Sequence, residues 1–350
     1  MVLSGYLIKI PYWICWQSLR LTGKLQEFIF YVESEHDYNV IENILPHFEQ
    51  PYRIAAKNRK VRKALETRGV NNVALWPVFP RVLMMTRHAF HRFPISGVKK
   101  IGIKHGTYHF KKMIAARKYN LFDLYIFTTE AEVQMAARKG IKNGVAGGQP
   151  KLDTFFLPKT LNQAKEIKNT RKIDPSRKTL LFTTTWDRSG LSAIDRWIDH
   201  LEKLSKHYNV CVSLHPMMSE QYFSRILNMP FVLYAQPEDL PAFMHLADVL
   251  ISDTSSVMGE FCALNKPIIT FAVEKGWRLT QEVKDMIRDI SLQIQSIEEL
   301  EQAIVAYWQN PLLKQEERLR WQKVFYGDID QSHGKKAASI IKEYLAKLSD

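Results

Sequence analysis

Short apolar runs alternate with helical patterns along most of the chain. In its first part, we expect buried strands at 28–32, 72–76, 100–103 and 123–128, with helices at 36–49, 57–68 and 130–139. In its second part, the same patterns predict strands at 179–184, 209–214, 231–234, 248–252 and 267–271, and helices at 191–207, 219–227, 238–246, 256–264, 296–307 and 333–348. This alternation is typical of parallel sheets covered by helices.

The stretch 156–178 is charged and polar and contains Pro158 and Pro175, which predicts a linker. The chain therefore divides into an α/β domain over 1–155 and a second over 179–350. Both are expected to be doubly wound and Rossmann-like, and to face a central cleft. Because ligands bind beyond the carboxyl ends of the strands in such sheets, functional residues should directly follow strands.

Composition excludes several classes of protein. Three widely spaced cysteines form no CxxC pair, which argues against a disulfide framework or structural zinc and favours a reducing cytoplasm. The sequence lacks HExxH, GxxxxGK[ST], GxSxG and glycine-rich dinucleotide motifs. A dehydrogenase is therefore disfavoured, and we predict neither a metal site nor a cofactor.

The positive charge lies in the first part of the chain. The formal net charge is +13, with 23 Lys and Arg against 10 Asp and Glu in residues 1–150, and 26 of each in the remainder. Such asymmetry predicts an anionic partner for the first domain. Nucleic acid, an anionic membrane and a phosphorylated acceptor all qualify.

Residues 6–16 are apolar and aromatic, but Lys9 and Pro11 interrupt them. Eleven residues are too few to cross a bilayer core of roughly 30 Å as a helix. Neither do they match a signal peptide. Two interpretations of residues 1–25 stay open: an interfacial helix with Trp13, Trp16, Arg20 and Lys24 at the headgroups, or the first core helix of the domain.

The most distinctive segment is DVLISDTSSVMGEFCALNKPIITF at 248–271. A buried strand ends there in Asp253, Thr254, Ser255 and Ser256, and a helix begins at once. A helix start offers free N–H groups and a positive dipole end, which suit a pyrophosphate. The alternative is a capping box between a serine and Glu260.

Two histidines also follow predicted strands. His215 precedes a proline and could donate to a phosphate oxygen. His105 lies in the turn Lys104–His105–Gly106–Thr107, where it could take a proton from an attacking hydroxyl. His105 could equally be a turn histidine without chemistry, and a single His-Pro pair is weak evidence on its own.

Two further clusters are candidates for ligand binding. Paired glycines begin the turn Gly147–Asp153, which also carries Lys151. Thr184 and Thr185 follow a strand and precede Trp186 and Asp187, so that their hydroxyls could bind the donor.

In order, KHGT at 104–107, GQPKLD at 148–153, TTTWD at 183–187, HP at 215–216, SDTSS at 252–256 and NKP at 265–267 resemble the CDP-glycerol glycerophosphotransferase family of teichoic acid primases and polymerases. The resemblance runs from about residue 100 to the C-terminal DIDQSHGKKAASII. Thr254 stands where the family often has Tyr, and Lys151 where Arg is common.

The resemblance implies a GT-B-like fold and a transferase that moves glycerol phosphate, or a related alditol phosphate, from a CDP-activated donor to a hydroxyl of a membrane-linked saccharide or polyol phosphate. CMP would leave, and the product would be a cell-surface polymer such as teichoic acid or capsule. The protein would be cytoplasmic and peripheral to the inner face of the membrane.

The resemblance also distributes roles among the clusters. His105 would be the catalytic base, and His215 would stabilise the pyrophosphate. Lys104, Gly106 and Thr107 would face the acceptor. The donor would meet Lys151, Asp153, Thr184, Thr185, Asp253, Thr254, Ser255 and Ser256.

Two other functions stay open at this stage. One is a GT-B glycosyltransferase that uses a nucleotide-diphosphate sugar, since its pyrophosphate site would look alike. The other is a non-catalytic protein whose basic half binds nucleic acid or membrane.

Overall fold

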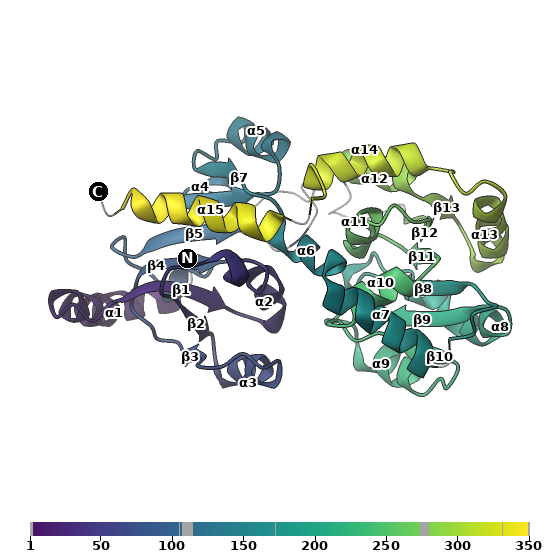
Figure 1. Cartoon of the computed structure of the whole chain (residues 1–350), viewed down its shortest axis with the longest axis horizontal. Coiled ribbons are helices and arrows are strands. Elements are labelled where there is room, and N and C mark those ends of the chain that lie inside the picture. The colour runs from purple at the N-terminus through teal and green to yellow at the C-terminus, as the bar shows by residue number, and fades with distance from the viewer. Residues whose placement is uncertain are drawn as a thin grey trace. The chain divides into compact units, whose positions relative to one another are not determined.

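The computed structural model describes residues 3–104, 106, 115–171, 173–273, 280–330 and 332–348 (Figure 1). It contains two compact units. Among the described residues, the first holds those up to Gly106, residues 115–154 and those from Tyr326 onward, and the second holds Phe155–Phe325. The fold is α/β, as predicted, with one parallel sheet in each unit.

The first unit is built on a seven-stranded parallel sheet of order β3-β2-β1-β4-β5-β6-β7. Its strands are β1 (Gln26–Val32), β2 (Arg53–Ala56), β3 (Ala74–Leu75), β4 (Pro80–Met85), β5 (Lys99–Ile103), β6 (Leu124–Phe127) and β7 (Gly144–Ala146). Its helices are α1 (Leu3–Leu21), α2 (Glu35–Ile41), α3 (Arg59–Thr67), α4 (Ala116–Tyr119), α5 (Glu130–Arg138) and α15 (His333–Ala346), and α6 (Pro150–Phe156) crosses into the second unit. The strand order reverses between β1 and β4, as in doubly wound sheets.

The second unit is built on a six-stranded parallel sheet of order β10-β9-β8-β11-β12-β13. Its strands are β8 (Thr179–Thr183), β9 (Asn209–Ser213), β10 (Val232–Tyr234), β11 (Val249–Ser252), β12 (Ile268–Phe271) and β13 (Leu292–Ile294). Its helices are α7 (Pro158–Thr170), α8 (Leu201–Ser205), α9 (Glu220–Leu227), α10 (Leu240–Leu246), α11 (Val257–Cys262), α12 (Gln281–Ile290) and α13 (Leu300–Gln309), with α14 (Gln315–Tyr326) ending at the unit boundary.

Several elements differ from those expected. Strand β4 was not predicted, although it is central to the first sheet, and β3 is shorter than the expected 72–76. The expected helix at 191–207 is instead two 3-10 turns, Ile194–Arg196 and Ile198–His200, followed by the short helix α8. Helix α12 and strand β13 were also missed.

The domain boundaries differ from the expected ones at two places. Much of the expected linker, 156–178, is helix α7, whose Thr160, Ala164 and Ile167 are buried. Helix α7 contacts α10 in the second unit, where the amide of Gln163 donates to Asp239 (2.6 Å). Prolines did not prevent this helix because Pro158 occupies its first position, where no N–H is needed.

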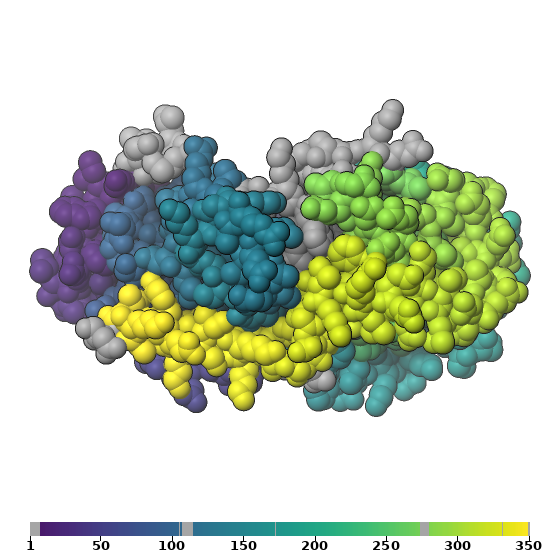
Figure 2. All heavy atoms as spheres, turned by 90° about the horizontal axis from the view of Figure 1, so that it is seen from above, coloured from purple at the N-terminus to yellow at the C-terminus, as the bar shows by residue number. Residues whose placement is uncertain are grey.

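The C-terminal helix belongs to the first unit, although the sequence placed it with the second. Ala337, Ala338 and Ile341 of α15 are buried in one core of the first sheet, with Phe28 and Phe30 of β1. Figures 1 and 2 show this yellow helix lying on the blue and teal elements of that unit. The amphipathic pattern of a helix shows that it packs on a sheet but not on which one.

Helix α1 combines features of both interpretations of the N-terminal segment. Tyr12 and Trp16 are buried, and they donate to the carbonyls of Val78 and Pro80, both at 2.8 Å. Trp16 therefore belongs to the core and not, as the interfacial interpretation required, to the headgroup face. Trp13, at 50% exposure, lies on the outer side. Among the described residues, no helix is both long and apolar enough to span a bilayer.

The NKP segment has a structural role in the second unit. Asn265 adopts a left-handed backbone (φ 51°) and its side-chain oxygen accepts from the guanidinium of Arg318. The ammonium of Lys266 donates to three carbonyls at the end of α10, those of Met244, His245 and Ala247. Such carbonyls have no partner within their own helix.

Lys266→Met should therefore lower the free energy of unfolding by about 1–3 kcal/mol, because the apolar side chain leaves these carbonyls without their donor. Urea denaturation checks this. Lys203→Met, on the exposed side of α8, is the control and should change the midpoint little. Equal midpoints for the two variants would contradict a stabilising role of Lys266.

Candidate active site

Three adjacent strands of the second sheet bring distant predicted residues to one edge. β9, β8 and β11 are neighbours and parallel, so their carboxyl ends lie together. Thr184 and Thr185 follow β8, His215 follows β9, and Asp253 follows β11. The sequence placed each of them after a strand, and the strand order makes them one cluster.

Asp253 is the centre of this cluster. Its carboxylate is buried and accepts from the hydroxyls of Thr184 and Thr185, the latter at 2.8 Å. It also accepts from backbone N–H groups, at 3.0 Å each, of Thr185, Ala193 and Ser255. Burial raises the pKa of Asp253, while these hydrogen bonds act in the opposite direction. Because two hydroxyls and several backbone N–H groups donate to its carboxylate, Asp253 organises the loops after β8 and β11.

The serine and threonine hydroxyls are linked to this centre. Thr185 and Thr254 share a hydroxyl contact of 3.0 Å, and Ser255 accepts from the N–H of Val257 at 3.4 Å. Ser256 precedes α11 but makes no side-chain capping bond, so the capping box expected with Glu260 is absent at this position. Helix α11 has only six residues, so a ligand here would rely on the hydroxyls and loop amides more than on a long helix.

A cavity of about 300 Å³ opens beside Asp253 and Thr254. Lys284 and Arg288 of α12 line it, together with Gln281 and Gln293. Arg288 also pairs with Asp285 at 2.8 Å. These residues were not among the predicted site residues because their helix was not predicted, although an amphipathic pattern with Val283, Met286, Ile287 and Ile290 on its buried side was present.

His215 has a defined tautomer. Its Nδ1 accepts from the N–H of Met217 at 3.1 Å, so the neutral ring carries its proton on Nε2. The ring is half-buried. A neutral donor at the end of β9 is one of the two forms in which the histidine could bind a phosphate oxygen.

In the first unit, the described part of the KHGT turn begins with a buried ion pair. Lys104 follows β5 and its ammonium pairs with Glu132 of α5, a side chain only 1% exposed. The second oxygen of Glu132 accepts from the N–H of Thr128 at 3.0 Å. Gly106 has open space where a Cβ would lie. His105 and Thr107 lie outside the described residues.

Asp153 has a structural partner that the sequence did not reveal. Its buried carboxylate accepts from the N–H groups of His333 (3.3 Å) and Gly334 (2.7 Å) at the start of α15. Burial raises the pKa of Asp153. Asp153 therefore holds the start of α15 within the first unit. The sequence had assigned this residue to donor binding. Lys151, two residues earlier, is half-buried in the same unit.

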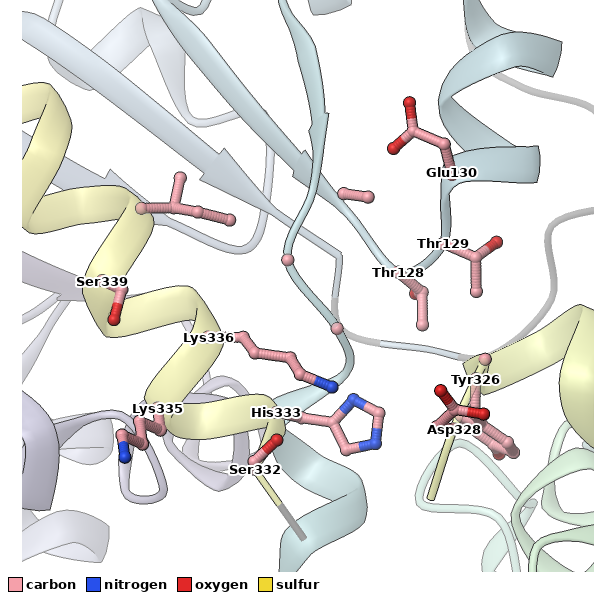
Figure 3. Close-up of a pocket in the computed structure, with 15 residues that line it drawn as sticks. Thr128, Thr129, Glu130, Tyr326, Asp328, Ser332, His333, Lys335, Lys336 and Ser339 are labelled. Atoms are coloured by element: carbon pink, nitrogen blue, oxygen red, sulfur yellow. The ribbon is translucent and has the colours of Figure 1, made fainter. Parts of the chain in front are cut away.

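The paired glycines make room for His333. Gly148 has φ +83°, and a Cβ there would lie 2.5 Å from Nδ1 of the imidazole. The N–H of Gln149 donates to this Nδ1 at 3.2 Å. A cavity of about 620 Å³ lies beside the imidazole (Figure 3). Its lining includes these glycines, His333, Lys336 and Thr128. In the part of the chain that the structure describes, no group of three or more His, Cys, Asp or Glu is arranged to hold a metal ion.

Comparisons with known proteins identify relatives of this chain. Teichoic acid ribitol-phosphate polymerase TarK of Staphylococcus aureus (strain NCTC 8325 / PS 47) is 24% identical over 201 residues, which are 53% of this chain and 38% of TarK. The teichoic acid glycerol-phosphate primase of Bacillus spizizenii (strain ATCC 23059 / NRRL B-14472 / W23) is 27% identical over 134 residues, 36% of this chain and 33% of the primase. The matches thus span only about a third of these relatives.

Solved structures share the fold over nearly the whole chain. The wall teichoic acid polymerase TagF superposes with a TM-score of 0.68 at 13% identity, over 98% of this chain and 99% of that one. UDP-GlcNAc 2-epimerase from Neisseria meningitidis, bound to UDP-GlcNAc, superposes with a TM-score of 0.61 at 11% identity, over 92% of this chain and 100% of the epimerase chain. These likenesses show the GT-B-like fold that the sequence predicted.

The family model described as CDP-Glycerol:Poly(glycerophosphate) glycerophosphotransferase matches residues 83–319. This range begins in β4 and ends in α14, so it contains the Lys104 turn, the paired glycines and the whole Asp253 cluster. It covers more than half of the chain. The protein therefore belongs to the CDP-glycerol:poly(glycerophosphate) glycerophosphotransferase family.

Proposed function

We propose that this protein transfers glycerol phosphate, or a related alditol phosphate, from a CDP-activated donor to a hydroxyl of a polyol phosphate or saccharide acceptor. The observation that carries this proposal is the family match over residues 83–319. The names of the two relatives, a ribitol-phosphate polymerase and a glycerol-phosphate primase, support an alditol phosphate as the transferred group.

The edge of the second sheet supplies groups for the donor's pyrophosphate. Thr254 borders a pocket with Lys284 and Arg288. His215 lies two strands away in the same sheet, after β9, and can donate from Nε2. Hydroxyls, cations and a neutral imidazole N–H all stabilise phosphate oxygens. In this assignment Thr184 and Asp253 act indirectly, because their polar atoms hold the loops.

The reaction is an in-line displacement at phosphorus. A bond forms between the acceptor oxygen and the glycerol-bearing phosphorus while the bond from that phosphorus to the CMP oxygen breaks. His105 accepts the proton of the attacking hydroxyl, and CMP departs with the electron pair. The donor-site hydroxyls and His215 stabilise the charge that develops on CMP. The proposal requires no cofactor.

The acceptor belongs with the first unit in this proposal. The excess of basic residues over 1–150 suits a phosphate-rich polymer or an anionic lipid surface. Exposed Ile10, Trp13 and Ile14 on α1 suit shallow insertion between headgroups. We therefore propose a lipid-linked acceptor and a cytoplasmic protein peripheral to the membrane.

Nucleotide release tests the proposal. The purified protein is mixed with a lipid-linked acceptor extract and, separately, CDP-glycerol, CDP-ribitol or UDP-GlcNAc. We expect CMP from one CDP-alditol and no nucleotide from the UDP-sugar. Release of UDP instead would overturn the phosphotransferase proposal in favour of a glycosyltransferase, a class whose fold and pyrophosphate chemistry are similar.

A further inference from the structure

The cavity in the first unit contains buried polar atoms that the fold leaves without partners. Within the described residues, Nε2 of His333 and the hydroxyl of Thr128 find no hydrogen-bond partner, although the two residues are only 1% and 4% exposed. Both residues line the cavity of about 620 Å³. Unsatisfied buried polar groups cost free energy and are rare, so two in one cavity suit a polar ligand.

The structure fixes what these atoms can offer. Because Nδ1 of His333 accepts from the N–H of Gln149, its neutral ring has a hydrogen on Nε2. Burial lowers the pKa of His333, which favours this neutral form. The backbone of Thr128 is held on both sides, since its N–H donates to Glu132 and its carbonyl accepts from Gly148 at 3.0 Å. Its hydroxyl is therefore free to serve a ligand.

Positive charge lies at the same cavity. Figure 3 shows the imidazole of His333 and the ammonium end of Lys336 pointing into the space below Thr128 and Thr129. Lys336 uses one of its three donors on Asp330 at 2.9 Å. The cavity is much larger than an inorganic phosphate, and Asp328, Ser332 and Ser339 add groups that can bind hydroxyls.

We propose that this cavity binds an alcohol phosphate, with its phosphate oxygens on Nε2–H of His333, the hydroxyl of Thr128 and the ammonium of Lys336. The hydroxyls of the alcohol contact the polar groups around the cavity. The choice of an alcohol phosphate rests on the proposed function. Since the cavity lies in the unit that carries the basic excess and the Lys104 turn, the bound group is a polyol phosphate unit of the acceptor.

Binding of a short glycerol phosphate oligomer, measured by calorimetry on the full chain, tests this inference. Thr128→Val should weaken binding by roughly tenfold or more, because a hydrogen bond to a charged group is lost. Its melting temperature should stay equal or rise, since the hydroxyl has no partner to lose. His333→Asn, which can keep an acceptor near Gln149 but removes Nε2, should weaken binding similarly.

Tyr31→Phe is the matched control. The hydroxyl of Tyr31 is also buried without a partner in the first unit, but Tyr31 does not line the cavity. It should bind the oligomer as the unaltered protein does. Equal affinities for Thr128→Val and Tyr31→Phe would overturn the inference, even if His333→Asn failed to fold.

Parallel titrations separate the sources of the phosphate. If Thr128→Val weakens the binding of CDP-glycerol but not of the oligomer, the cavity binds the alcohol phosphate of the donor. The assignment of the cavity to the acceptor is then overturned. If inorganic phosphate bound as tightly as the oligomer and lost affinity equally in Thr128→Val, the cavity would be a general anion site. This outcome would overturn the proposal. Oligomer binding that depends on Thr128 would support it even if no CMP were released, which would count only against the transferase function.

Discussion

Asp253→Ala is expected to abolish CMP release and to lower the free energy of unfolding by about 3–5 kcal/mol. The carboxylate is the common acceptor for two hydroxyls and four loop amides, from Thr184, Thr185, Ala193, Thr254 and Ser255. Hydroxyls can rotate toward other acceptors, but buried amides cannot. The loops after β8 and β11 would therefore separate, and the donor groups they position would be lost.

The expected loss of activity is at least ~10³-fold, because several phosphate-binding groups are displaced together. Urea denaturation and nucleotide release with CDP-glycerol measure the two effects. Asp253→Asn should have intermediate stability and activity. Its side-chain oxygen still accepts hydrogen bonds, but its NH₂ group faces the donors that bind the other carboxylate oxygen.

Asp248→Ala is the matched control for this prediction. Asp248 immediately precedes β11, at the end of the strand opposite to Asp253, and accepts from the N–H of Thr179 at 2.8 Å. Its removal should cost about 1 kcal/mol of stability and leave nucleotide release unchanged. An Asp253→Ala protein as stable and active as Asp248→Ala would show that the cluster does not depend on the carboxylate.

His105→Ala is expected to lower kcat by roughly 10²–10⁴-fold, the usual contribution of a general base. The prediction comes from the KHGT turn that follows β5, and His105 itself lies outside the described residues. Because the proposed donor groups are on the second unit, CDP-glycerol affinity and the unfolding midpoint should change little. The loss should also remove the acidic limb of the pH–rate profile, where the base becomes protonated.

His47→Ala, an exposed histidine of the same unit, provides the comparison. It should retain full kcat and both limbs of the profile. If His105→Ala kept most of its activity, or lost it only through weaker donor affinity, the assignment of His105 as the base would be wrong.

Local patterns were enough to predict the α/β class and the site residues at the carboxyl edge of the second sheet. An apolar run followed by a cluster of hydroxyl residues predicts a strand end, and this placed Thr184, Thr185, His215 and Asp253 correctly after their strands. Strand β4 begins with Pro80 and Arg81, which weaken the apolar pattern of a buried strand. It was therefore not predicted, although it is central in the sheet.

The class of fold, the charge asymmetry and the family thus follow from the sequence alone, since each depends on residue types and their spacing. The roles of the polar side chains become visible in the folded chain, because their partners are distant in the sequence. Asp153 meets Gly334 across 181 positions, and Thr184 meets Asp253 across 69. Asp253 therefore supports the donor loops from within, Asp153 fastens α15 to the first unit, and His333 is left with one buried donor facing a cavity. No local pattern contains these pairings, since they follow from which strands and helices the fold makes neighbours.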